Sequence, residues 1–235
     1  MIYVYIWYNA TTPIHEPREY WGCRHLPPST KTLNTKLDAV DRPYHHGDLR
    51  RAIVETASAM LREDKGWQFT LREVARRAGV SHAAPYKHFP DKAALLLELA
   101  LRGFDQLGQE LKAAIVPRPR SARKEFLAVG GAYIAFGLSN PALYRLMFSS
   151  DAGDLQVAHI SESALSALGV LLDVLARGQE TGAFKKRPLQ GQAAACWAQV
   201  HGLTMLSIDG LLMPEKVGSA PVQAALDTLL DGVLG

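Results

Sequence analysis

The sequence predicts an all-α protein, with a small N-terminal domain of three helices and a larger C-terminal domain that is also helical. Apolar residues recur at helical spacing from Asp48 onward, and no segment after Ser121 alternates apolar and polar residues as a strand does. Glycine and proline residues separate the helical segments. With 235 residues, of which 48% are hydrophobic, the chain is long enough to bury the core of one or two domains.

The first 43 residues differ from the rest, because prolines interrupt them and no helical period emerges. We interpret residues 1–43 as a disordered or loosely packed N-terminal arm. Two alternatives stay open. In the first, the arm results from translation that begins upstream of the true start, which would lie near Val40. In the second, it is a basic arm that reaches into a minor groove of DNA, although its Lys and Arg residues are sparse for that role.

Residues 44–92 carry nine Lys and Arg against six Asp and Glu, a net charge of +3. Residues 1–43 sum to +1 and residues 93–235 to −1. A modest positive field on one small domain suits a surface that meets DNA phosphates. Charge alone fits an ordinary solvated surface equally well, so the motif within residues 44–92 has to decide between the two.

That motif is Thr70–Lys92, where TLREVARRAGVSHAAPYKHFPDK predicts two short helices joined by a tight turn. Thr70 and Glu73 have the spacing of a capping box, in which each side chain binds the backbone amide of the other residue. Gly79 fits the left-handed position that ends the first helix, and Ser81 can cap the second. This order of elements is a helix-turn-helix, whose second helix usually lies in the major groove of DNA.

Two longer helices flank this motif. The first spans about Asp48–Lys65, capped by Asp48 or the glycine before it, and completes a three-helix DNA-binding domain over residues 44–92. After the motif, Asp91 is a suitable cap for a long helix over Lys92–Ala114. A helix of this length can connect two domains.

The C-terminal domain, residues 93–235, is predicted to continue with helices at about Arg123–Leu138, Pro141–Phe148, Leu155–Glu180, Gln190–Leu211 and Pro221–Leu234. The last two helices are unusually apolar and rich in Ala and Leu. Two such neighbouring helices suit a four-helix interface with a second copy of the chain, so we expect a homodimer. The alternative is that their apolar residues pack only inside the core of one chain.

The motifs resemble those of the TetR/AcrR family of one-component transcriptional regulators. The resemblance is strong over about Asp48–Leu111, where the string FTLREVARRAGVSHAAPYKHFPDKAALL carries it. The C-terminal half resembles the branch with a WHG-type domain, through AYIAFGLSNPALYRLMF (Ala132–Phe148) and the pattern Trp197-x-x-x-His201-Gly202. The resemblance implies a homodimer with a DNA-binding head, a ligand-binding body and, usually, repression that a small molecule relieves.

The resemblance also implies which residues contact a double-stranded operator. Pro85 departs from the family pattern, which often has Leu there. A proline donates no amide hydrogen and biases Ala84 away from helical geometry, although it suits the first turn of a helix that begins at this point. For Tyr86 and His88, the alternative to phosphate contact is packing in the core. The expected DNA-binding residues are Thr70, Arg72, Ser81, His82, Ala83, Ala84, Tyr86, Lys87, His88 and Lys92.

The residues expected at the base edges offer few hydrogen-bonding groups. His82 and Lys87 offer strong hydrogen-bond donors, whereas Ala83 and Ala84 can meet only the methyl group of thymine. Sequence specificity is therefore expected to depend partly on the shape of the DNA.

The C-terminal domain is expected to bind an unknown small-molecule effector that is apolar or amphipathic. Trp197, His201 and Met205 are each four residues apart, so they share one face of a helix. An apolar pocket with a few polar groups suits such a ligand, and the alternative is a filled core in which Trp197 and His201 only pack. The expected ligand-binding residues are Tyr133, Phe136, Tyr144, Met147, Phe148, Trp197, His201 and Met205.

Other function classes find little support in the sequence. It has no CxxC, no HExxH, no glycine-rich phosphate loop and no paired Glu-x-x-His, so we expect no catalysis, no metal and no cofactor. Cys23 and Cys196 are far apart, which indicates a reduced, cytoplasmic protein, and no apolar run approaches the ~20 residues of a membrane span. The remaining rival is a constitutive DNA-binding protein without a small-molecule effector.

Overall fold

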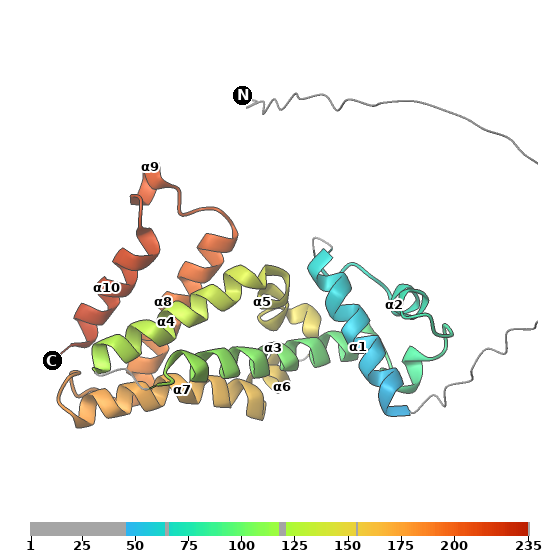
Figure 1. The fold of residues 1–235 in the computed structure, drawn as a ribbon, viewed down its shortest axis with the longest axis horizontal. Coiled ribbons are helices and arrows are strands. Elements are labelled where there is room, and N and C mark those ends of the chain that lie inside the picture. The colour runs from blue at the N-terminus through green and yellow to red at the C-terminus, as the bar shows by residue number, and fades with distance from the viewer. Residues whose placement is uncertain (1–45, 64–65, 118–120, 154, 235) are drawn as a thin grey trace, which may run out of the picture. The chain divides into compact units, whose positions relative to one another are not determined.

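The computed structural model describes residues 46–63, 66–117, 121–153 and 155–234, and these ranges are predominantly helical (Figure 1). Within them there is no strand, and the one extended pairing is an isolated bridge between Phe184 and Leu234. The predicted all-α fold class is therefore confirmed. The N-terminal arm predicted over residues 1–43 lies outside the described residues.

Three elements form the N-terminal head: α1 (His46–Glu63), α2 (Leu71–Arg77) and a short 3-10 helix, η1 (Pro85–Lys87). Helix α1 begins before the predicted start, so Asp48 lies inside its first turn rather than ahead of it. Ile53 on the inner face of α1 is fully buried, as the predicted apolar stripe requires.

The predicted capping box at the start of α2 is confirmed. The Glu73 amide donates to the Thr70 hydroxyl at 3.2 Å, and the Thr70 amide donates to the Glu73 carboxylate at 2.6 Å. The backbone hydrogen bond from Thr70 is the main reason that the pKa of Glu73 lies below its ordinary value. After α2, Gly79 adopts a φ of +69°, a left-handed conformation that glycine enters without a Cβ penalty.

The second helix of the motif is shorter and less regular than predicted. The residues from Ser81 to Ala84 form a turn, and only Pro85–Lys87 are helical. The reason is Pro85, which has no amide to bond the carbonyl of Ser81, so the Ala84 amide bonds that carbonyl at 2.9 Å instead. Ser81 therefore caps no α-helix, and Pro85 occupies the first turn of η1. Ala84 nevertheless keeps α-helical backbone angles.

The long helix α3 has its predicted bounds, Lys92–Ala114, and the Asp91 carboxylate accepts a hydrogen bond from the Ala94 amide at 2.8 Å, as expected of a cap. From the head, α3 runs into the body, where it packs along α7 (Glu162–Glu180) and against α4 (Ala122–Ser139) (Figure 1). One continuous apolar core contains residues of both the head and the body.

The remaining helices of the body lie close to their predicted positions, with two additions. Helices α5 (Pro141–Met147), α8 (Leu189–Ile208) and α10 (Pro221–Val233) match predicted segments, although α8 ends earlier than expected. Two short helices, η2 (Ser150–Ala152) and α9 (Pro214–Val217), occupy segments predicted as loops. Helix α10 packs against α4 and α8.

The single helix predicted over Leu155–Glu180 is wrong, because the chain breaks into α6 (Leu155–His159) and α7. Ser161 causes the break. Its hydroxyl accepts a hydrogen bond from the Ala164 amide at 3.2 Å, which caps α7, and donates to a carbonyl of α6 at 2.7 Å. The break gives His159 a separate short helix at one end of α7.

Helices α4 and α5 together have the length and apolarity of a membrane span, but they meet at an angle of 107°. Among the described residues, no single helix has both properties.

Candidate nucleic-acid interface and ligand cavity

Most residues predicted to contact DNA are accessible on the head. Tyr86 in η1 is 51% exposed, although aromatic residues of a small domain are usually needed in its core. This exposure disfavours the core packing that the sequence left open for Tyr86. The other exposed residues of the set are Thr70, Arg72, Ser81, His82, Ala83 and Lys87.

Three residues of the predicted DNA-binding set are less accessible for contact with DNA. Ala84 is only 6% exposed and belongs to the same core as Phe89, so the predicted contact of its side chain with a thymine methyl is wrong: the tight turn before Pro85 directs it inward. The Nε2 atom of His88 is buried without a partner among the described residues, which leaves Nδ1 for any phosphate contact. Lys92 is half-buried, with Nζ 5.7 Å from the centroid of the Phe69 ring.

An ion-pair cluster fixes α1 against α3. The Arg50 guanidinium donates two hydrogen bonds to the Glu98 carboxylate, at 2.7 and 3.1 Å, and Arg102 donates a third at 3.0 Å. Partial burial raises the cost of ionising Glu98, but these hydrogen bonds and charges outweigh it and lower the pKa of that carboxyl. The orientation of α1 on α3 is therefore set by these directional hydrogen bonds as well as by apolar packing.

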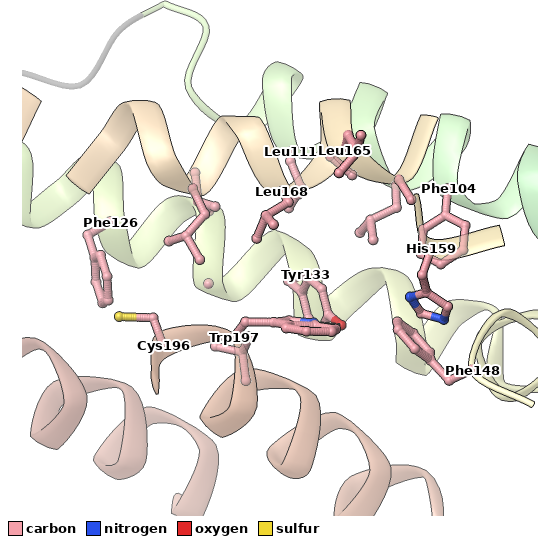
Figure 2. Close-up of a pocket in the computed structure, with 17 residues that line it drawn as sticks. Phe104, Leu111, Phe126, Tyr133, Phe148, His159, Leu165, Leu168, Cys196 and Trp197 are labelled. Carbon is pink, nitrogen blue, oxygen red and sulfur yellow. Dashed lines mark hydrogen bonds between the residues drawn. The ribbon is translucent and has the colours of Figure 1, made fainter. Parts of the chain in front are cut away.

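The body holds a cavity of about 240 Å³ between α3, α4, α7 and α8 (Figure 2). Its wall is apolar apart from four side chains that carry polar atoms, which are Tyr133, His159, Cys196 and Trp197. The apolar wall includes Phe104, Leu107 and Leu111 of α3, Phe126 and Val129 of α4, and Leu168 and Leu171 of α7. Such a lining suits a mostly apolar ligand with few hydrogen bonds.

The structure places only part of the predicted ligand-binding set at this cavity. The predicted residues that do line the cavity are Tyr133, Phe148 and Trp197. Those that do not are Phe136, Tyr144, Met147, His201 and Met205. Phe136, Tyr144 and Met147 are fully buried, because α5 packs tightly against α3 and α4 and leaves no space there. The cavity opens instead toward α7.

A hydrogen-bond network lies behind the wall. The Trp197 indole N–H donates to the Tyr133 hydroxyl at 3.1 Å, and the Tyr144 hydroxyl lies 3.0 Å from that of Tyr133 and 2.6 Å from Nδ1 of His201. Burial raises the pKa of both tyrosines, so they stay protonated at neutral pH. Burial, with a smaller contribution from His159, lowers the pKa of His201. The predicted residue His201 therefore lies behind the wall, where its ring contacts Phe148 and its Nδ1 faces the Tyr144 hydroxyl.

Cys196 contributes to the wall as an apolar group. Burial raises the pKa of its thiol to about 11, so it is not a thiolate at neutral pH and is a poor nucleophile. Among the described residues, no three His, Cys, Asp or Glu side chains are placed to hold a metal ion.

The sequence prediction missed His159 and the walls formed by α3 and α7. The apolar stripes of these helices were visible in the sequence, but a stripe that faces a filled core and one that faces a cavity have the same spacing. His159 carried a weak signal, since it is a lone histidine between Ala158 and Ile160.

The head and the body together define a helical, helix-turn-helix type of DNA-binding protein. Residues 53–99 match the family described as bacterial regulatory proteins, tetR family, and residues 126–233 match the description tetracyclin repressor-like, C-terminal domain. The chain belongs to the TetR family of transcription regulators, and the predicted resemblance is confirmed at this level. Assignment to the WHG-type branch stays a prediction.

Solved structures show the same fold. A protein of unknown function from Rhodococcus sp. RHA1 is 33% identical, with a TM-score of 0.71, over 83% of this chain and 100% of that one. A putative tetR family transcription regulator from Shewanella sp. PV-4 is 20% identical, with a TM-score of 0.58, over 80% and 98% of the two chains. The TetR family transcriptional regulator PfmR from Thermus thermophilus is 21% identical, with a TM-score of 0.55, over 76% and 97%. The last two similarities concern the fold alone.

Proposed function

We propose that this chain is a repressor that binds a pseudo-palindromic operator as a homodimer and is released by a small apolar or amphipathic effector. Residues 44–92 serve as the DNA-binding head and residues 93–235 as the effector-binding and dimerisation body. The observation that supports this most strongly is the position of α3. Its first turn belongs to the predicted DNA surface, at Lys92, and its later turns line the cavity, at Phe104, Leu107 and Leu111.

Dimerisation is supported by an exposed face on α8. Gly191, Ala194, Ala195 and Ala198 are all exposed and recur at helical spacing, followed by the exposed Leu206. Small residues allow a second helix to approach closely, and α10 lies beside α8 to complete a four-helix contact with another copy. A twofold dimer presents two recognition elements, which fit successive major grooves when they stand about 34–36 Å apart.

Release follows if the effector favours a different spacing of the two heads. A ligand shifts such an equilibrium only by its difference in affinity for the two states. Ligand against Phe104, Leu107 and Leu111 presses on the helix that carries Lys92 at its other end. A small change in the tilt of α3 then alters the distance between the paired recognition elements.

The DNA part of this proposal is tested by selecting bound duplexes from a random pool with the full-length chain. We expect the selected DNA to contain an inverted repeat whose half-site centres are about one helical turn apart. Enrichment of a single half-site, bound as tightly as the full site, would contradict binding as a twofold dimer. If no molecule that binds the cavity displaces the selected DNA, the chain is better described as a constitutive DNA-binding protein.

A further inference from the structure

The cavity differs in chemistry from one end to the other. At one end His159 lies beside Phe104 and Phe148, with Tyr133 and Trp197 next to them (Figure 2). The far end is formed by apolar groups, which include Phe126 and the protonated thiol of Cys196 (Figure 2). A ligand that fills the cavity therefore meets hydrogen-bonding groups at one end only.

His159 is the group at this end with free hydrogen-bonding capacity. Its ring centroid lies 5.1 Å from that of Phe104 and 5.3 Å from that of Phe148, and these contacts hold the imidazole at the wall. Among the described residues it makes ring contacts but no hydrogen bond, whereas the Trp197 N–H is already bonded to Tyr133. A neutral imidazole always carries one N–H donor, so His159 can bind an acceptor brought by a ligand.

The size of the cavity limits the ligand. Phe104 and Leu111 are seven residues apart on α3, which corresponds to about 10 Å along the helix axis. A cavity of about 150 Å³ holds benzene, so by simple proportion the 240 Å³ here correspond to about ten non-hydrogen atoms. An elongated molecule of that size spans the part of the cavity that lies alongside Phe104 and Leu111.

We propose that the effector is an elongated apolar molecule of about ten non-hydrogen atoms, with a carboxylate at one end that His159 binds through an imidazole N–H. That this ligand controls DNA binding rests on the proposed function, whereas its chemistry rests on the cavity. Among the described residues, the wall contains no Asp or Glu to neutralise a cationic head group, and its Trp197 N–H is already bonded to Tyr133. His159 thus sets which end of the ligand enters toward Phe148.

The experiment is calorimetric titration of the full-length chain with octanoate, 3-phenylpropanoate, octan-1-ol and octylamine. Octanoate contains ten non-hydrogen atoms, and 3-phenylpropanoate has the same head group on an aromatic body. We expect both carboxylates to bind. The tighter of the two will show whether the apolar part of the ligand is a chain or a ring. Octylamine is expected to bind at least tenfold more weakly than the carboxylates. Octan-1-ol is expected in between, because a hydroxyl accepts a weaker hydrogen bond than a carboxylate.

Variants at His159 identify the residue that recognises the head group. His159→Phe keeps the ring contacts and removes the N–H, so we expect at least a tenfold loss of carboxylate affinity and a change below threefold for octan-1-ol. His159→Gln restores a donor and is expected to recover part of the loss. Gly169→Ala on α7, which is outside the cavity lining and has nothing within 4 Å of the added Cβ, is the control and should leave the preference for carboxylate over amine unchanged.

Equal binding of octylamine and octanoate, no binding of either carboxylate, or unchanged octanoate affinity in a folded His159→Phe variant would overturn the proposal. A second titration, with the selected duplex present, separates it from the proposed function. If octanoate binds through His159 but does not displace DNA, the ligand assignment stands and effector-controlled repression fails. If DNA is displaced by the amine alone, the repression mechanism stands and the ligand assignment fails.

Discussion

The Trp67 indole Nε1 donates a 3.0 Å hydrogen bond to the Asp151 carboxylate, which joins the turn before α2 to η2 of the body. Asp151 follows Phe148 by three residues, and Phe148 forms part of the cavity wall. Phe148 is therefore connected to the head through this hydrogen bond as well as through α3. This contact and the packing of α1 on α3 together hold the head to the body.

A double-mutant cycle with Trp67→Phe and Asp151→Ala measures this contact. Each change removes one partner, and we expect a coupling free energy of about 0.5–1 kcal/mol. This is below the ~1.5–3 kcal/mol of a hydrogen bond to a charged group, because the pair is exposed to solvent. Chemical denaturation of the four proteins gives the value. Additive losses would show that the hydrogen bond contributes nothing to joining the two parts.

Lys92→Gln tests the phosphate contact at the start of α3. The Gln side chain keeps part of the packing over Phe69 and removes the charge, so affinity for all duplexes should fall alike, with the slope of log K against log salt reduced by about one. Lys124→Gln, an exposed residue of α4, is the matched control and should leave the slope unchanged. A loss confined to one base position would assign Lys92 to base reading instead.

Local signals account for the parts of the head that the sequence predicted well. The Thr70–Glu73 capping box and the Asp91 cap depend only on neighbouring residues, so their spacing was sufficient. The short recognition element was harder, because the effect of Pro85 depends on where the turn places it. In the body, the sequence around Ser161 did not distinguish it from an ordinary helix residue, although its hydroxyl caps α7.

The cavity was predicted less well than the fold, for a physical reason. Helical spacing shows which face of a helix is apolar but not what that face packs against, and the predicted ligand-binding set included residues of α5 and none of α7, which lines the cavity. Tyr144 and Met147 have the composition of pocket residues, yet tight packing of α5 buries them completely. Only the tertiary contacts distinguish a wall from a filled core.

Gly178→Ala tests the packing of the loop after α7. A Cβ at this position would overlap the Phe184 ring, which is itself almost fully buried, so the ring would have to move. We expect a loss of about 1–3 kcal/mol in the free energy of unfolding. Gly169→Ala on the same helix meets nothing within 4 Å and is expected to stabilise the protein by about 0.5–1 kcal/mol. Equal effects of the two changes would show that Phe184 is not constrained.

The stability of the protein should fall as the pH drops below about 6.5 because of His201. Its pKa in the folded chain lies below the ordinary 6.5, through burial first and His159 second, so the unfolded chain binds the proton more readily. Stability is therefore complete above about pH 6.5 and is lost as the pH falls toward the folded pKa. Denaturation at about pH 7.5, 6.5 and 5.5 measures this, and His201→Gln should flatten the decline. An identical decline in the variant would place the titrating group elsewhere.

The most direct measurement uses a fluorescent duplex that carries the selected inverted repeat. The full-length chain is titrated into this duplex at low ionic strength, and the complex is then analysed by sedimentation. We expect two chains on each duplex, binding that weakens steeply as salt rises, and much weaker binding to a duplex with one half-site. A chain that stays monomeric and binds no double-stranded DNA under these conditions would contradict recognition by a paired helix-turn-helix.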